Sequence, residues 1–120
     1  MIPRPVISIL SDKLPDLETH ASLDSLFMYA DAPGDVPEGN KSVKVQEWLN
    51  RTNKVSEQPL KVLGKLLEKY IELPDLETIP SYDTFKRSQY QESLEFKNSL
   101  IELLGKYGLT YIQGGIISSG

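Results

Sequence analysis

The chain of 120 residues contains no cysteine and a single histidine, His20. Without cysteine it can form neither a disulfide nor a thiolate-ligated metal site, and the absence suits a reducing cytosol. One histidine supplies at most part of a metal ligand set, and it would be the only imidazole base for a Ser/His/Asp triad. We therefore expect no metal site and no cofactor, and a solvent-exposed or helix-capping role for His20.

The sequence also lacks a long hydrophobic run and the common catalytic motifs. No apolar stretch approaches the roughly 20 residues of a membrane span, and no basic segment precedes the apolar start, as a signal peptide would require. These absences predict a cytoplasmic protein without membrane contact. No P-loop or G-x-G-x-x-G sequence occurs. The seven carboxylates of residues 1–40, Glu18 among them, show no spacing typical of an acid/base pair, so we expect solvated acids and no enzyme.

The length fits one domain over residues 1–120, and the content of 39% hydrophobic and 25% charged residues is typical of a soluble globular protein. The net charge of −4 is unevenly spread, because residues 1–40 carry two cations and residues 41–69 carry seven. The candidate nucleic-acid contacts on this basic face are Lys44, Arg51, Lys54, Lys61 and Lys65. Phosphate binding is weak in an acidic chain, so we favour a solvated face or pairing with segment 1–40.

Two helices are predicted in the first 31 residues. The first begins at Pro3 or Pro5, where a missing amide costs no helical hydrogen bond. It ends near Pro15, since proline disfavours the helical conformation of the residue before it. The second follows a cap supplied by Thr19 or Ser22, with apolar residues at helical spacing behind it.

A loop and a basic helix come next. Residues 32–40 hold two prolines and two glycines, which predicts a fairly rigid loop. Asn40 or Ser42 then caps a third helix. Trp48 lies on the apolar stripe of this helix, so the spacing predicts a core position for its ring.

The second half of the chain predicts two more helices. One begins near Pro59, contains Gly64, which would permit close helix packing, and ends before a loop at 73–81. The other and longest spans 82–107, with Gly108 as its left-handed cap. The inner positions expected on this longest helix are Phe85, Tyr90, Leu94, Ile101, Leu104 and Tyr107.

The end of the chain changes character. Apolar runs at 109–112 and 116–117 flank Gln-Gly-Gly, which predicts a tight β-hairpin. A lone hairpin is marginal in water, so it must pack on the helices or on another part of the protein. The candidate interaction surface on the hairpin consists of Tyr111, Ile112, Ile116 and Ile117. Residues 118–120, Ser-Ser-Gly, predict the start of a linker in a longer protein.

Three stretches carry a resemblance: LDSLFMYADAPGDVPEGNKSVKVQEWLNRTNK at 23–54, VLGKLLEKYIE at 62–72 and LLGKYGLTYIQGGII at 103–117. The most specific parts are the Ala-Pro-Gly-Asp turn before the tryptophan helix and the Tyr-Gly-Leu-x-Tyr-x-x-Gly-Gly ending. In this order they resemble the N-terminal region of bacterial abortive-infection family proteins. The resemblance implies phage defence in a bacterium and assigns no catalytic residue. The C-terminal domain that gives the family its name is missing from this sequence.

These observations predict a mainly α fold, a compact bundle of four to five helices with a short C-terminal β-hairpin. The leading functional hypothesis is a non-catalytic sensor or protein-interaction module of a phage-defence protein. Its expected partner is its own C-terminal domain or a second copy in a homo-oligomer. The alternative is a nucleic-acid-binding module that uses the basic face of residues 41–69.

Overall fold

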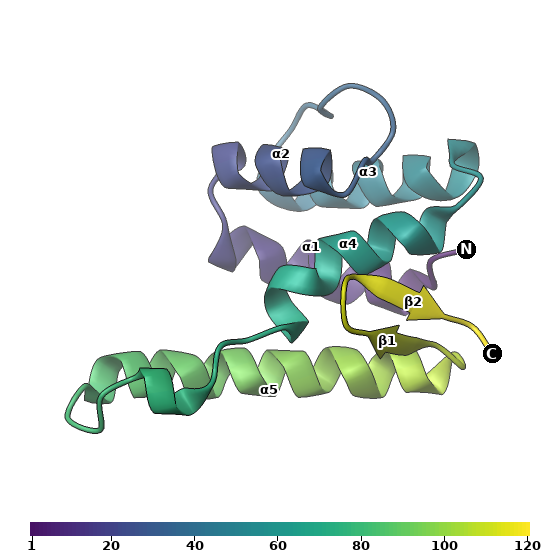
Figure 1. Cartoon of the computed structure of the whole chain (residues 1–120). Coiled ribbons are helices and arrows are strands. Elements are labelled where there is room, and N and C mark those ends of the chain that lie inside the picture. The colour runs from purple at the N-terminus through teal and green to yellow at the C-terminus, as the bar shows by residue number, and fades with distance from the viewer.

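A computed structural model describes residues 1–120 and confirms the mainly helical fold with a C-terminal hairpin (Figure 1). The elements are α1 (Arg4–Leu17), α2 (His20–Tyr29), α3 (Lys41–Val55), α4 (Pro59–Ile71), the 3-10 helix η1 (Leu76–Thr78), α5 (Thr84–Lys106), β1 (Thr110–Ile112) and β2 (Ile116–Ser118). η1 lies in the segment that was predicted as a loop. Ser118 belongs to β2, although the linker was predicted to begin there. None of the helices combines the length and apolar character that crossing a bilayer requires.

Local capping sets most helix ends where the sequence predicts them. The Thr19 side chain accepts a hydrogen bond from the Ser22 amide, and the Ser22 hydroxyl accepts one from the Thr19 amide, which forms a capping box at α2. Asn40 accepts from the Val43 amide at 2.9 Å and caps α3. At the end of α5, Gly108 has φ +70°, and the Leu109 amide bonds the Leu104 carbonyl, as in a Schellman motif.

The prediction that the first helix ends near Pro15 is wrong, because α1 continues to Leu17. Pro15 removes only one helical hydrogen bond, and the amide of Glu18 still bonds the Leu14 carbonyl at 2.9 Å. The fully buried Leu14 side chain holds this last turn against the core. Tertiary packing therefore outweighs the local cost of the proline.

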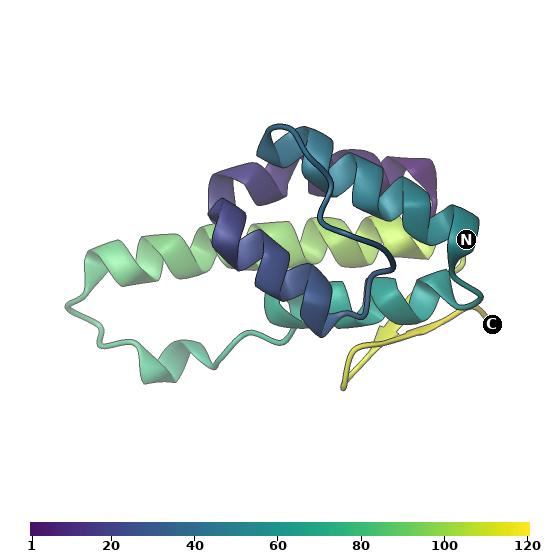
Figure 2. The same cartoon turned by 90° about the horizontal axis from the view of Figure 1, so that it is seen from above.

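The inner face predicted for α5 is largely wrong. Of the six predicted positions only Leu104 is fully buried. Tyr90 and Leu94 are half-buried. The exposed positions are Phe85, Ile101 and Tyr107, and the buried face consists of Phe96, Leu100 and Leu104. Figures 1 and 2 show that the N-terminal half of α5 projects beyond the other α-helices, which accounts for the exposure of Phe85 but not for that of Ile101 and Tyr107.

The core is built around α4, which packs against α2, α3, α5 and β2. α1 lies along α3 on the other side of this core. The Trp48 ring, 1% exposed, stacks on Phe27 with ring centroids 4.6 Å apart, which confirms its predicted core position. Its indole N–H donates to the Pro33 carbonyl at 3.2 Å, so the loop at 32–40 is tied to α3.

Candidate interaction surface

The hairpin lies beside α4 and α5, with β2 next to α4 and β1 next to α5 (Figure 1). Its two strands are antiparallel, with Tyr111 opposite Ile117 and Ile112 opposite Ile116. Because side chains alternate along a strand, these two pairs face opposite sides. Tyr111 and Ile117 are half-buried against the core, whereas Ile112 and Ile116 are 46% and 52% exposed. The structure thus brings the four predicted residues together but divides them between an inner and an outer face.

A set of hydrogen bonds, here named the hairpin latch, fixes the hairpin to α4. The Tyr111 hydroxyl and the Gly114 amide both donate to the carboxylate of Glu72, the latter at 2.8 Å. The Gly115 amide donates to the Tyr111 oxygen at 3.1 Å, and the Lys65 ammonium donates to the Gly114 carbonyl at 2.9 Å. The three bonds between the hairpin and α4 join residues 39 to 49 positions apart, so sequence periodicity gives no signal for them.

The hairpin latch changes the acidity of its own groups. The hydrogen bond from Tyr111, followed by that from the Gly114 amide, lowers the pKa of the Glu72 carboxyl. Burial, together with the hydrogen bond to Glu72, raises the pKa of the Tyr111 hydroxyl. Glu72 is therefore ionised and Tyr111 protonated at neutral pH, which is the combination that the hydrogen bond requires. The inner side of the hairpin is fixed, and its outer pair is presented on a rigid support.

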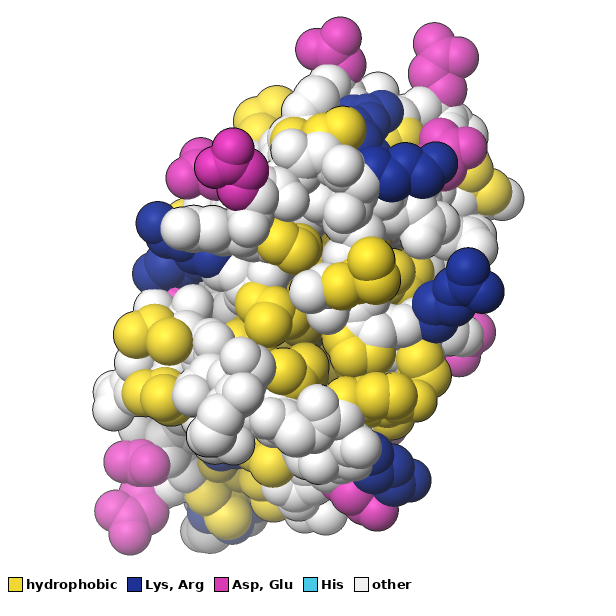
Figure 3. Space-filling model, turned by 90° about the vertical axis from the view of Figure 1, so that its right-hand side faces the viewer, with side chains coloured by type: hydrophobic (Ala, Val, Ile, Leu, Met, Phe, Trp, Pro, Cys, Tyr) yellow, Lys and Arg dark blue, Asp and Glu magenta, His cyan; other side chains and the backbone are white.

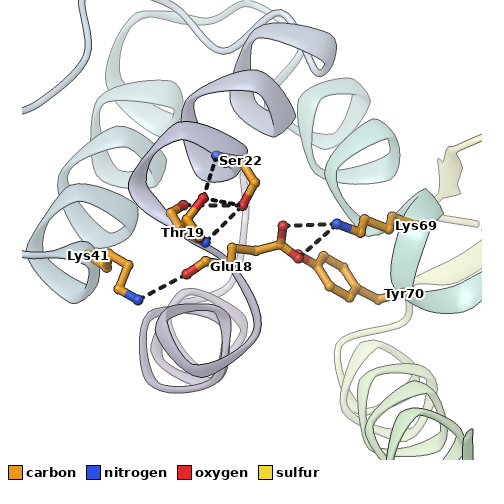
Figure 4. Close-up of polar contacts among 6 residues, drawn as sticks. All are labelled: Glu18, Thr19, Ser22, Lys41, Lys69 and Tyr70. Atoms are coloured by element: carbon orange, nitrogen blue, oxygen red, sulfur yellow. Dashed lines mark hydrogen bonds and ion pairs between the residues drawn. The ribbon is translucent and has the colours of Figure 1, made fainter. Parts of the chain in front are cut away.

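A second polar cluster joins the end of α1 to α4 (Figure 4). The Glu18 carboxylate, 4% exposed, accepts from the Lys69 ammonium at 2.9 Å and from the Tyr70 hydroxyl at 2.9 Å. Its backbone carbonyl accepts from Lys41 at 3.0 Å. The expectation of a solvated carboxylate is wrong for Glu18, because its partners lie about 50 residues away along the chain.

The balance of forces at Glu18 keeps it charged. Burial alone would raise the pKa of the carboxyl, but the hydrogen bonds from Lys69, Tyr70 and Ser22 outweigh it and lower the pKa. Burial and the contact with Glu18 raise the pKa of the Tyr70 hydroxyl well above its ordinary range. A hollow of about 320 Å³ opens beside the cluster. Each polar group of the cluster already has a partner, so the arrangement ties two helices together rather than presenting a reactive group.

Three of the five residues predicted for the basic face bond within the chain. Lys44, predicted to lie on the basic face, is instead buried and forms an ion pair with Asp24 at 2.8 Å. Arg51 donates to the carbonyl of Asp35 at 2.6 Å. Lys65 belongs to the hairpin latch. Lys54 and Lys61 are exposed and make neither a hydrogen bond nor an ion pair.

The remaining chemistry-bearing residues do not converge on one place. His20 is exposed in the first turn of α2, as predicted. No group of three or more His, Asp or Glu side chains is placed to hold a metal ion. Comparison of the chain with protein-family models, with curated proteins and with solved structures finds no match. The functional argument therefore rests on the surfaces of this fold.

Proposed function

We propose that this chain is a non-catalytic sensor or protein-interaction module of a bacterial phage-defence protein, acting in the cytoplasm. The observation that supports the protein contact is the outer pair Ile112 and Ile116, which stands exposed on a hairpin whose inner side is fixed. Its own C-terminal domain, or a second copy, is the partner we expect. The defence context comes from the three sequence stretches that resemble abortive-infection proteins.

The outer pair has the properties of a binding surface and differs from isolated exposed apolar residues. Single exposed apolar residues are common, but here two β-branched side chains lie directly opposite each other on neighbouring strands. The hairpin latch fixes the strands beneath them, so a partner that covers the pair does not have to order the backbone first. Burying such side chains contributes roughly 25 cal/mol per Å² of apolar area.

The pairing of the polar groups supports a non-catalytic role. A general base or nucleophile must have a polar atom that can reach a substrate. The buried ionisable side chains are instead paired within the fold, Glu18 with Lys69 and Lys44 with Asp24. No buried side-chain nitrogen or oxygen lacks a hydrogen-bond partner.

The test compares two isoleucines of similar exposure. Ile112→Lys changes the outer pair, and Ile101→Lys changes α5, where the side chain is 43% exposed. Phage plating is measured on bacterial cells that express the intact gene product with each change. We expect Ile112→Lys to abolish protection and Ile101→Lys to retain it. Equal protection by both variants would show that the outer pair is not the contact, and no protection by the wild type would refute the defence role.

Turnover is the second measurement. The purified chain is incubated with nucleotides, RNA and DNA, and products are followed by chromatography. We expect no conversion, and any turnover that survives repurification would overturn the non-catalytic assignment.

The nucleic-acid alternative keeps one supporting observation, the exposed and unpaired ammonium groups of Lys54 and Lys61. Two free cations predict weak binding with a shallow salt dependence, of slope about −2 on a log–log plot. An electrophoretic shift of RNA at low salt that disappears with Lys54→Glu and Lys61→Glu would favour this alternative. Absence of any shift at low salt would dispose of it.

A further inference from the structure

Both chain ends lie at one end of the molecule, and Figure 3 shows an apolar patch there with both basic and acidic side chains around it. Two adjoining hollows of about 670 and 630 Å³ share Met1, whose side chain is 81% exposed. Tyr107 lines the first hollow, and Leu60 and Ile116 line the second. We name this surface the terminal face. Ile116 also belongs to the outer pair of the hairpin, so the two apolar surfaces are continuous.

The lining of the two hollows is opposite in charge to the chain as a whole. The hollows are lined by the cations Arg4, Lys54, Lys61 and Lys65 and by one anion, Glu57, in a protein of net charge −4. Of the four cations only Lys65 has a partner within the chain. An apolar centre with free cations at its rim fits a partner that is itself apolar and acidic.

The opposite end of the molecule carries such a surface. The segment from Leu73 to Phe85, here named the acidic arm, contains three aspartate or glutamate residues and no cation. It projects away from the terminal face in both views (Figures 1 and 2). Its exposed apolar side chains are Leu76 at 40%, Tyr82 at 84% and Phe85 at 71%. Tyr82 and Met1 are the two most exposed large apolar side chains of the protein, one at each end.

The nearest cations leave the outer part of the acidic arm unneutralised. Arg87 donates to the carbonyls of Ile79 and Pro80, at 3.1 and 3.2 Å, and so holds the arm against α5. Lys86 lies 3.9 Å from Asp83. Asp75 and Glu77 are exposed and have no cationic partner. The outer part of the acidic arm therefore carries negative charge that no cation of the same chain neutralises.

We propose that the acidic arm of one copy docks on the terminal face of a second copy, head to tail. The inference rests on the proposed function, for which it names a second copy of this chain as the partner. The two surfaces match in apolar character and are opposite in charge, and because they lie at opposite ends, one molecule cannot join its own pair. Such a contact is heterologous, so it generates a ring if the rotation closes and a filament if it does not.

The association is expected to be weak, because an arm of this size buries an area at the low end of specific interfaces. Sedimentation velocity is therefore measured from about 10 μM to about 1 mM, at low and at high salt. We expect the mean mass to rise with concentration and to fall as salt is added, since the rim is ionic.

Charge reversal at each surface tests the contact. The arm variant carries Asp75→Lys and Glu77→Lys, and the face variant carries Lys54→Glu and Lys61→Glu. Each variant alone places like charges together, so the dissociation constant should rise at least about tenfold. Mixing the two variants restores opposite charges at both surfaces and should restore association. A control with Asp12→Lys and Asp16→Lys on α1 matches the charge change of the arm variant and should associate like the wild type or more strongly.

Several results would overturn the proposal. These are a wild type that stays monomeric at about 1 mM, association that neither variant weakens, or a mixture that stays as dissociated as its parts. Circular dichroism verifies folding, and Arg4→Glu with Lys61→Glu replaces the face variant if that variant unfolds. A monomeric wild type whose nucleic-acid binding the face variant removes would assign the face to nucleic acid instead. A monomeric protein that still protects cells, and loses protection with Ile112→Lys, would refute the self-contact and leave the proposed function standing.

Discussion

The backbone of Gly64 in α4 touches the backbone of Gly115 in the hairpin turn. A Cβ atom on Gly64 would overlap the Gly115 carbonyl oxygen and lie 2.8 Å from its carbonyl carbon. Gly115 has φ +74°, a conformation that favours glycine, so the turn cannot easily move aside. The sequence indicated that Gly64 allows a close approach. The structure shows that the partner is the hairpin rather than another helix.

Gly64→Ala should therefore destabilise the protein although alanine is the better helix former. Overpacking costs about 1–3 kcal/mol, against about 1 kcal/mol gained in helix propensity. Chemical denaturation measures the net change. Gly105→Ala is the matched control, because a Cβ there meets nothing within 4 Å and the residue lies in α5. We expect the control to be neutral or stabilising, and equal stability of the two variants would contradict the close contact.

Glu18→Gln should destabilise the protein in a pH-dependent way. The change removes the buried negative charge that pairs with Lys69. This loss should lower the free energy of unfolding by about 1–2 kcal/mol near pH 7. Because the pKa of Glu18 is lowered in the folded state, its contribution is present above the ordinary pKa of 4.5. It is lost as the pH falls through the folded pKa.

Denaturation of both proteins between pH 7 and about pH 3 measures this difference. The gap in unfolding free energy between wild type and Glu18→Gln should shrink below pH 4.5. The exposed Glu92 borders the same hollow, so Glu92→Gln is the control and should leave stability unchanged. A gap that stays constant with pH would show that the loss comes from packing and not from the charge.

We expect substitutions at the two members of the Lys44–Asp24 ion pair to have unequal effects on stability. Asp24→Asn leaves the buried Lys44 ammonium without a counter-charge and should cost about 3 kcal/mol. Lys44→Met keeps the apolar stem, removes the buried charge and should cost less than about 1 kcal/mol. Thermal unfolding of the two variants compares them. If Lys44→Met were the more damaging change, the ion pair would contribute net stability.

Local signals explain which parts of the fold the sequence predicts. The caps at Thr19 and Asn40, the apolar stripe around Trp48 and the turn at Gly108 each involve residues within four or five positions. Periodicity and capping rules act over that range, so they succeed there. At Pro15 a local rule fails, because burial of the last turn of α1 outweighs one lost hydrogen bond.

The polar contacts of the surface were not predictable in the same way. Glu18 meets Lys69 and Glu72 meets Tyr111 across 51 and 39 residues, and nothing in the spacing marks these partners. The exposure of Phe85, Ile101 and Tyr107 escaped prediction for a related reason. Apolar periodicity reports that a face can be buried, but whether another element covers it depends on the tertiary arrangement.

Removing one hydroxyl group from the hairpin latch should loosen the attachment of the hairpin to α4. Tyr111→Phe removes the hydroxyl that donates to Glu72 and accepts from the Gly115 amide. The hairpin amides should exchange with solvent several-fold faster, about tenfold for each 1.4 kcal/mol of local opening energy, while those of α4 keep their rates. Tyr107→Phe is the matched control, since its hydroxyl has no hydrogen-bond partner, and it should leave exchange unchanged. Because the hydrogen bonds from Tyr111 and the Gly114 amide lower the pKa of Glu72, acid below that pKa should reduce the protection of the hairpin amides, measured relative to their intrinsic exchange rates, by more in the wild type than in Tyr111→Phe. If hairpin exchange is equally slow in both tyrosine variants at neutral pH, backbone contact at Gly64 rather than the hairpin latch holds the outer pair in place.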